Sequence, residues 1–281
     1  MRERRFIQCD VFSPVPTQGN ALAVVVDGEG LSDEEMQRFA AWTNLAETTF
    51  IVPPVDPVAD YRLKIFTPVR EMLFAGHPTL GSCAAWLHCG GQSKAPDVVR
   101  QECGVGIVEI DTGNSAELAF VAPPTTITPM PPAQLDAIID ALDIPRDKIV
   151  KTARLNNGPE WQALQLDCAQ TVLAMDSSRV RWPAFKGIGL IGAHPAAAEC
   201  DFEVRMLAPS SGMSEDPITG SLNAALAHWL QQQGQLDGPV VVAQGTNINR
   251  LGRVSVRPVA DGGGVKIGGQ THVLVDGRLR L

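Results

Sequence analysis

Three acid–base side chains in this sequence stand where the chain turns or a helix begins, namely Glu47, His77 and Asp216. Glu47 is expected in a loop after a helix, between the apolar residues Leu45 and Phe50. A carboxyl group held partly away from water has a raised pKa, so it can give or take a proton near neutral pH. Glu47 is therefore the candidate general acid or base, and a solvated loop carboxylate is the alternative.

His77 and Asp216 occupy matching places in two similar hexapeptides. Residues 77–82 read HPTLGS and residues 216–221 read DPITGS, an offset of 139 residues in a chain of 281. A repeat with a period close to half the chain predicts two similar lobes, because a solenoid needs at least three short units. His77, whose ordinary pKa is about 6.5, is a candidate second proton carrier or orienter. Asp216 is a candidate ligand for a substrate amine, and a purely structural helix cap is the alternative for both residues.

The two hexapeptides predict two helix starts. In each, the His or Asp would cap the helix, Pro would take the first helical position, and small residues would follow. The free N–H groups around Gly81-Ser82 and Gly220-Ser221 would then lie at the positive end of a helix dipole, which attracts a carboxylate or phosphate. We expect both helix starts to converge on one small anionic ligand, with two ordinary capped helices as the alternative.

The composition limits the classes of partner. A net charge of −8 and a pI of about 5.1, with no basic run, argue against a nucleic-acid-binding surface. The six cysteines form no C-x-x-C pair and the five histidines show no metal-ligand spacing, so no metal site or disulfide framework is expected. The sequence shows no signal peptide and no apolar run long enough for a membrane span, which predicts a cytoplasmic protein without a membrane partner.

The hydrophobic pattern predicts a mixed α+β chain in which each half has mostly strands and one main helix. Strands and helices do not alternate strictly, which argues against a doubly wound parallel sheet. No Gly-x-Gly-x-x-Gly turn or Walker loop is present. Residues 123–132 are rich in Pro and Thr and are the best linker candidate. We expect an N-terminal lobe at residues 1–122 and a C-terminal lobe at 123–281, with the end of the chain able to cross back onto the N-terminal lobe.

Four motifs, in order along the chain, resemble one known family. They are residues 10–25 (DVFSPVPTQGNALAVV), 44–54 (NLAETTFIVPP), 66–82 (FTPVREMLFAGHPTLGS) and 215–227 (EDPITGSLNAALA). They are similar to the phenazine-biosynthesis isomerase family (PhzF-like), which shares the diaminopimelate epimerase fold. The resemblance implies two pseudo-symmetric lobes, each a barrel-like, mostly antiparallel sheet wrapped around a central helix. It also implies an active site between the lobes, a homodimer and cofactor-free chemistry.

The resemblance also implies roles for single residues. Glu47 matches the Glu that moves a proton within dihydro-3-hydroxyanthranilate in the phenazine enzyme. His77, Asp216 and Ser221 match the other site residues of the family. Epimerases and racemases on this fold use one Cys per lobe, and no cysteine of this chain falls at the matching places. Ala46 departs from the phenazine enzymes, which usually carry Ser there, so the catalytic class carries over better than the substrate.

These observations lead us to expect a cofactor-independent isomerase that moves a proton on a small carboxylate-bearing metabolite. Glu47 would act as the general acid/base, and His77 and Asp216 would position the substrate and stabilise developing charge. The expected substrate-binding residues are Asn20, Gly76, Thr219, Gly220 and Ser221. The alternatives are an epimerase or dehydratase of a hydroxylated amino acid, and a non-catalytic protein that binds small anions.

Overall fold

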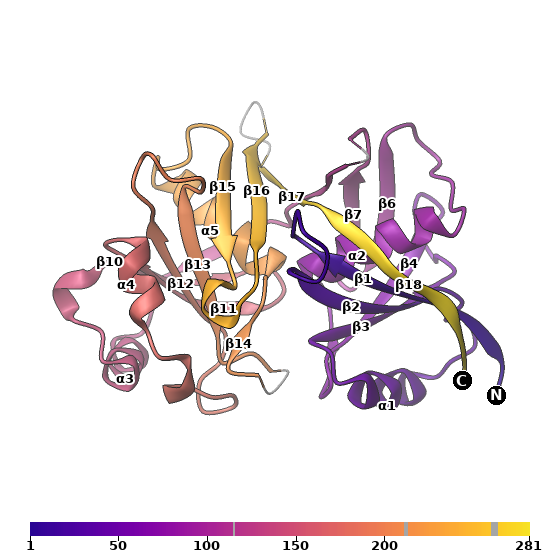
Figure 1. Ribbon diagram of the computed structural model, residues 1–281, viewed down its shortest axis with the longest axis horizontal. Helices are drawn as coiled ribbons and strands as arrows, with labels where there is room; N and C mark the ends of the chain where they lie inside the picture. The colour runs from indigo at the N-terminus through magenta and orange to yellow at the C-terminus, as the bar shows by residue number, and fades with distance from the viewer. Residues whose placement is uncertain (115, 211–212, 260–263) are drawn as a thin grey trace.

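The chain folds into two halves of mixed helix and sheet that lie side by side (Figure 1). The computed structural model describes residues 1–114, 116–210, 213–259 and 264–281. Both chain ends lie together on the outer side of the N-terminal half. The predicted α+β class, with sheets built around helices, is confirmed.

In the N-terminal half, a sheet surrounds helix α2 (Gly76–His88), while helix α1 (Asp33–Thr43) packs on the outer face of the sheet. The strands are β1 (Glu3–Val11), β2 (Asn20–Val25), β3 (Glu47–Val52), β4 (Tyr61–Phe66), β5 (Glu71–Met72), β6 (Val98–Cys103), β7 (Gly106–Asp111) and β8 (Leu118–Val121).

The C-terminal half repeats this plan around helix α5 (Gly220–Gln232). Its strands are β10 (Ile149–Asn156), β11 (Glu160–Leu166), β12 (Ile188–Ala193), β13 (Phe202–Leu207), β14 (Glu215–Asp216), β15 (Val240–Gln244), β16 (Gly252–Pro258) and β17 (Val265–Gly269). Its remaining helical segments are α3 (Pro132–Leu142), α4 (Ala169–Ala174) and the 3₁₀ turns η1 (Arg146–Lys148), η2 (Ser177–Arg179) and η3 (Thr246–Ile248).

The strands of the two halves pair in the same order. In the N-terminal half the order is β1–β2–β3–β4–β6–β7–β8, with parallel pairing only at β2–β3 and β4–β6. In the C-terminal half it is β10–β11–β12–β13–β15–β16–β17, with parallel pairing only at β11–β12 and β13–β15. Antiparallel pairing of β8 with β17 joins the halves. The duplication inferred from the repeat is therefore real.

Each half also receives a strand from the segment that follows the other half. Strand β9 (Thr126–Thr128) follows the N-terminal half and pairs with β10. Strand β18 (Thr271–Arg280) follows the C-terminal half and pairs with β1, so the last strand lies beside the first (Figure 1). The two halves are thus tied together by an exchange of strands, and residues 1–122 and 123–281 remain our proposed lobes.

Helix α2 packs directly on β1 and β2 because it carries small residues. A Cβ atom at Gly81 would lie 2.6 Å from Leu22 Cδ2 and 3.0 Å from Val11 Cγ2, so only glycine fits there. The neighbouring Ser82 hydroxyl is buried and lies 2.9 Å from the Thr49 hydroxyl. Gly81 and Ser82 are therefore core residues within the helix, and the prediction that their N–H groups face a ligand is wrong.

The predicted helix caps are also wrong. His77 is the second residue of α2, and Asp216 lies in β14, before α5 begins. The N-cap residues are Ala75 and Thr219, and neither makes a side-chain cap hydrogen bond.

The register of the repeat differs from the one that the hexapeptides suggest. The first helical residues are Gly76 and Gly220, which are 144 rather than 139 residues apart. Pro78 lies inside the first turn of α2, whereas Pro217 lies before α5. A glycine and not a proline is the first helical residue in both cases, so the prediction that Pro begins each helix is wrong.

Candidate active site

The first residues of α2 and α5 touch each other through their backbones. A Cβ atom at Gly76 would lie 2.6 Å from Gly220 Cα and 2.7 Å from Ser221 N. A Cβ atom at Gly220 would lie 2.8 Å from Phe12 Cζ and 3.0 Å from Gly76 Cα. Glycine is required at both positions because no side chain fits between the helices. The two helix starts therefore meet as expected, and the anionic ligand between them stays a prediction.

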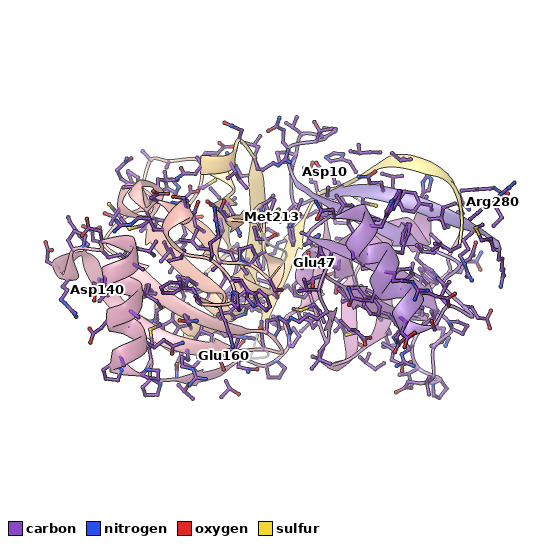
Figure 2. The ribbon with its side chains drawn as sticks, turned by 90° about the horizontal axis from the view of Figure 1, so that it is seen from below. Asp10, Glu47, Asp140, Glu160, Met213 and Arg280 are labelled. Atoms are coloured by element: carbon purple, nitrogen blue, oxygen red, sulfur yellow. The ribbon has the colours of Figure 1, made fainter. Side chains whose placement is uncertain are left out.

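A cavity of about 460 Å³ lies at these helix starts. Both halves contribute to its wall, and Figure 2 shows Glu47 at their junction. The charged and titratable side chains that line it are Glu47, Arg70, His77, Glu160, Lys186 and Asp216. Two tryptophans and two methionines add an apolar wall, namely Trp161, Trp182, Met72 and Met206. The cavity therefore combines acid–base groups with surfaces suited to a small ring or chain.

Glu47 opens β3, opposite Leu22 in the parallel pairing with β2, and its side chain is 16% exposed. Burial raises its pKa well above the usual value, and the nearby Asp216 carboxylate raises it further. The Arg70 guanidinium opposes both effects. The structure thus places Glu47 at a strand start rather than in a loop, with the raised pKa that a general acid/base requires.

His77 faces Glu47 from α2, with 3.4 Å between Nε2 and Glu47 Oε2. On its other side, His77 Nδ1 lies 3.2 Å from Asn20 Nδ2. The amide nitrogen only donates, so Nδ1 accepts and the neutral ring carries its proton on Nε2. Burial lowers the His77 pKa to about 3. His77 is therefore a neutral N–H donor aimed at the cavity near Glu47.

We expect His77→Gln to reduce the loss of stability in acid. The unfolded chain binds a proton at this residue below pH 6.5, whereas the folded protein binds it only near a pKa of about 3. Acid therefore favours the unfolded state of the wild type, by about 2 kcal/mol between about pH 6.5 and 4.5. Urea unfolding at these two pH values measures the free energy of unfolding, which should fall by about this amount less in the variant than in the wild type. An equal fall in both proteins would contradict the lowered pKa of His77.

Asp216 enters from β14 and is 7% exposed. Its Oδ1 accepts a hydrogen bond from Asn20 Nδ2 at 3.3 Å, and its Oδ2 accepts one from the Thr219 hydroxyl. Burial raises its pKa to about 6, the two hydrogen bonds oppose this, and Glu215 adds to it. Asp216 is thus mostly ionised at neutral pH and gains its proton as the pH falls to about 6.

Asn20 links the two halves behind the cavity. Its Nδ2 approaches His77 Nδ1, Asp216 Oδ1 and the Ile218 carbonyl, the last at 2.8 Å. It is 1% exposed and is not part of the cavity wall. The structure therefore favours a positioning role for Asn20 over the predicted direct contact with substrate.

The remaining predicted binding residues line the cavity, namely Gly76, Thr219, Gly220 and Ser221. The sequence pattern missed Asn157, whose Nδ2 donates to the Ser221 carbonyl at 2.8 Å and whose Oδ1 accepts from Trp161 Nε1 at 3.1 Å. It also missed Arg70. The signal for Arg70 was present, since this cation directly precedes Glu71 within the motif that contains His77.

A metal site, a thiol site and a membrane span each have structural requirements, which apply here to the part of the chain that the structure describes. No three His, Cys, Asp or Glu side chains there are arranged to hold a metal ion. The six cysteines are free, and the cavity wall contains none of them. Among the described helices, none has the length and apolar character needed to cross a membrane.

Comparison with known proteins gives consistent results. The sequence profile described as "PhzC-PhzF: Phenazine biosynthesis-like protein" matches residues 9–277. "Antisense-enhancing sequence 1" of Schizosaccharomyces pombe is 33% identical over 299 residues, covering 99% of both chains. The trans-2,3-dihydro-3-hydroxyanthranilate isomerase of Pseudomonas aeruginosa is 30% identical over 289 residues, also covering 99% of both.

A solved structure shows the same fold. The Bacillus anthracis phenazine biosynthesis protein of the PhzF family superimposes with a TM-score of 0.81, covering 100% of both chains at 21% identity. The profile match spans nearly the whole chain and agrees with the four motifs on which the resemblance rests. The chain belongs to the PhzC-PhzF family of phenazine biosynthesis-like proteins.

Proposed function

We propose that this protein is an isomerase that moves a proton on a small carboxylate-bearing metabolite, in the manner of trans-2,3-dihydro-3-hydroxyanthranilate isomerase. The observation that carries the proposal is the meeting of Glu47 and His77, 3.4 Å apart, in the cavity where the two helix starts converge. Supporting it, the relative from Pseudomonas aeruginosa bears that enzyme's name and aligns along 99% of both chains.

Glu47 would take a proton from one atom of the substrate and return it to another. This transfer leaves the proton count and the oxidation state unchanged, so it needs no co-reactant and no cofactor. The raised pKa of Glu47, caused first by burial and then by the Asp216 carboxylate, suits both directions, because the carboxyl group holds a proton more readily than an exposed carboxyl group does. The Glu47 side chain is 16% exposed, so the proton that it holds can exchange with solvent.

The other groups would hold the substrate and stabilise charge. The N–H groups at Gly76, Gly220 and Ser221 lie at the positive ends of two helix dipoles, which favours a substrate carboxylate there. The neutral His77 would donate its Nε2–H to negative charge that develops as Glu47 removes the proton. Asp216 would accept from a substrate amine or hydroxyl group.

The competing reactions make different demands on the cavity. An epimerase with one thiol on each side of the substrate would need cysteines in the wall, and the described wall has none. A protein that only binds small anions would have no use for a buried carboxyl group with a raised pKa. We also propose that the protein works in the cytoplasm as a homodimer, as the family resemblance implies.

We expect the protein to exchange substrate hydrogen with solvent. The protein would be incubated with trans-2,3-dihydro-3-hydroxyanthranilate in deuterated water, and the product analysed by mass spectrometry and NMR. Deuterium should appear at the carbon that receives the proton. Incorporation without inversion of a stereocentre supports the isomerase, and inversion supports the epimerase. Binding without any exchange, for this compound and for hydroxylated amino acids, would support the anion-binding protein and overturn the proposal.

A further inference from the structure

Gln244, the last residue of β15, is a buried amide that uses all its hydrogen-bonding groups on one turn of chain. It is 0% exposed. Its Oε1 accepts from Thr219 N at 3.0 Å and from Asn223 Nδ2 at 2.9 Å. Its Nε2 donates to the Asp216 carbonyl at 3.3 Å and to the Thr219 hydroxyl oxygen at 3.0 Å. Gln244 is therefore bound to the segment from Asp216 to Asn223 through both the oxygen and the nitrogen of its amide.

These contacts allow only one orientation of the amide. Rotating it by half a turn would set Nε2 against two donors, Thr219 N and Asn223 Nδ2, and would set Oε1 against the Asp216 carbonyl. The Asn223 amide is fixed in turn, because its Nδ2 also donates to the Thr219 carbonyl at 2.9 Å. Gln244 Nε2 must then face the Thr219 hydroxyl.

The orientation of Gln244 settles where the Thr219 hydroxyl points. An amide N–H only donates, so the Thr219 oxygen accepts from Gln244. The single hydrogen of that hydroxyl is then left for Asp216 Oδ2. Asn20 donates to the other oxygen, Oδ1. Both oxygens of Asp216 are therefore hydrogen-bond acceptors, which is the arrangement that favours a carboxylate over a carboxylic acid.

Other charged groups also act on Asp216. Glu47 faces it across the cavity, and Glu215 adjoins it in β14. Glu215 is itself held by Arg205 of β13 in a buried ion pair of 2.6 Å. The neutral His77 is connected to Asp216 through the amide of Asn20. Arg70 lowers the pKa of Glu47. Burial and, to a smaller extent, Glu215 favour a proton on Asp216, and the hydrogen bonds from Thr219 and Asn20 are what oppose it.

The N-terminal half contains the same buried amide without the acid. Gln101 of β6 is also 0% exposed, and its Nε2 donates to the Thr79 hydroxyl at 3.1 Å. Thr79 is the fourth residue of α2, as Asn223 is the fourth residue of α5. The Thr79 hydroxyl, however, donates to the Ala75 carbonyl at 2.9 Å. Gln101 is thus a matched structural control with no carboxyl group at the end of its chain of hydrogen bonds.

We propose that Gln244 is a positioning residue for the active site: it fixes the Thr219 hydroxyl as a donor to Asp216 and thereby keeps Asp216 ionised beside Glu47. The same amide, through its bonds to the Asp216 carbonyl and Thr219 N, holds β14 against the start of α5. This inference rests on the proposed function, because it concerns how Asp216 is prepared for substrate.

The titration of Asp216 in the free protein tests the inference without any substrate. With ¹³C-labelled aspartate, the Asp216 carboxyl signal is assigned by its absence in Asp216→Asn, and its midpoint should lie near pH 6. Gln244→Met should raise the midpoint by about one pH unit, a tenfold change in proton affinity. Thr219→Val should raise it similarly, and the double variant should shift it no further than Thr219→Val alone.

Two variants serve as controls. Thr219→Ser keeps the hydroxyl, so the Asp216 midpoint should stay at the wild-type value. Gln101→Met should destabilise the fold but leave the Asp216 midpoint unchanged. An unmoved midpoint in Gln244→Met, an equal shift in Gln101→Met, or additive shifts in the double variant would each overturn the inference. Should Gln244→Met fail to fold, Gln244→Asn replaces it, since its shorter amide leaves the Thr219 hydroxyl while staying polar. Because no turnover is measured, this test and the exchange experiment can fail independently.

Discussion

Glu47→Gln should lower turnover by about 10²- to 10⁴-fold, with little change in KM, because a general acid/base contributes on that scale. Glutamine keeps the shape of the side chain but holds no transferable proton. The fold should remain intact, since the buried carboxyl group already carries a raised pKa and a neutral amide suits the same surroundings. Steady-state kinetics on trans-2,3-dihydro-3-hydroxyanthranilate, with deuterium incorporation as a second readout, would measure the effect.

The cavity offers a matched control in Glu160. This carboxyl group lines the same cavity but is paired with Arg154 at 2.6 Å, near the outer surface. Glu160→Gln makes the same chemical change away from His77 and should leave turnover close to that of the wild type. Turnover in Glu47→Gln equal to that in Glu160→Gln would remove Glu47 from the mechanism.

The sequence was most informative where local chemistry decides the structure. Glu47 stands among apolar residues, and the structure places it partly buried in the cavity. The repeat predicted the duplication, although with the wrong register. The hexapeptides share Pro and Gly-Ser, but the structure aligns Gly76 with Gly220, because these are the positions where two backbones must touch. That constraint involves residues from both halves, so no local pattern reveals it.

The sequence motif marked Asn20 as a site residue, but neither its positioning role nor Gln244 could be predicted from the sequence, for a similar reason. Both are polar side chains, and nothing in their neighbours along the chain marks them as buried. Their partners lie 57 to 198 residues away for Asn20 and 21 to 28 residues away for Gln244. Their roles follow only when the strands bring them behind the helix starts. A polar side chain tolerated in a core needs all its hydrogen bonds made, which the folded chain alone can show.

Gly76→Ala should both destabilise the protein and reduce turnover, because the new Cβ would lie 2.6 Å from Gly220 Cα and 2.7 Å from Ser221 N. Alanine favours a helix over glycine by about 1 kcal/mol. Overpacking of a rigid contact costs about 1–3 kcal/mol, and here the opposing atoms are backbone, which cannot rotate away. We therefore expect a net loss of stability. Separating the helix starts by even 1 Å would misplace the substrate relative to Glu47 and cost about 10²-fold in turnover.

Thermal unfolding and steady-state kinetics of Gly76→Ala would be compared with those of Gly238→Ala. At Gly238 no heavy atom would lie within 4 Å of the added Cβ, so the same substitution meets open space there. Gly238→Ala should leave both stability and turnover close to wild type, which separates the effect of crowding from that of replacing glycine. A Gly76→Ala variant as active as Gly238→Ala would show that the two helix starts have room to part without disturbing catalysis. The site would then not depend on their contact, and the carboxylate of the substrate would have to be held elsewhere in the cavity.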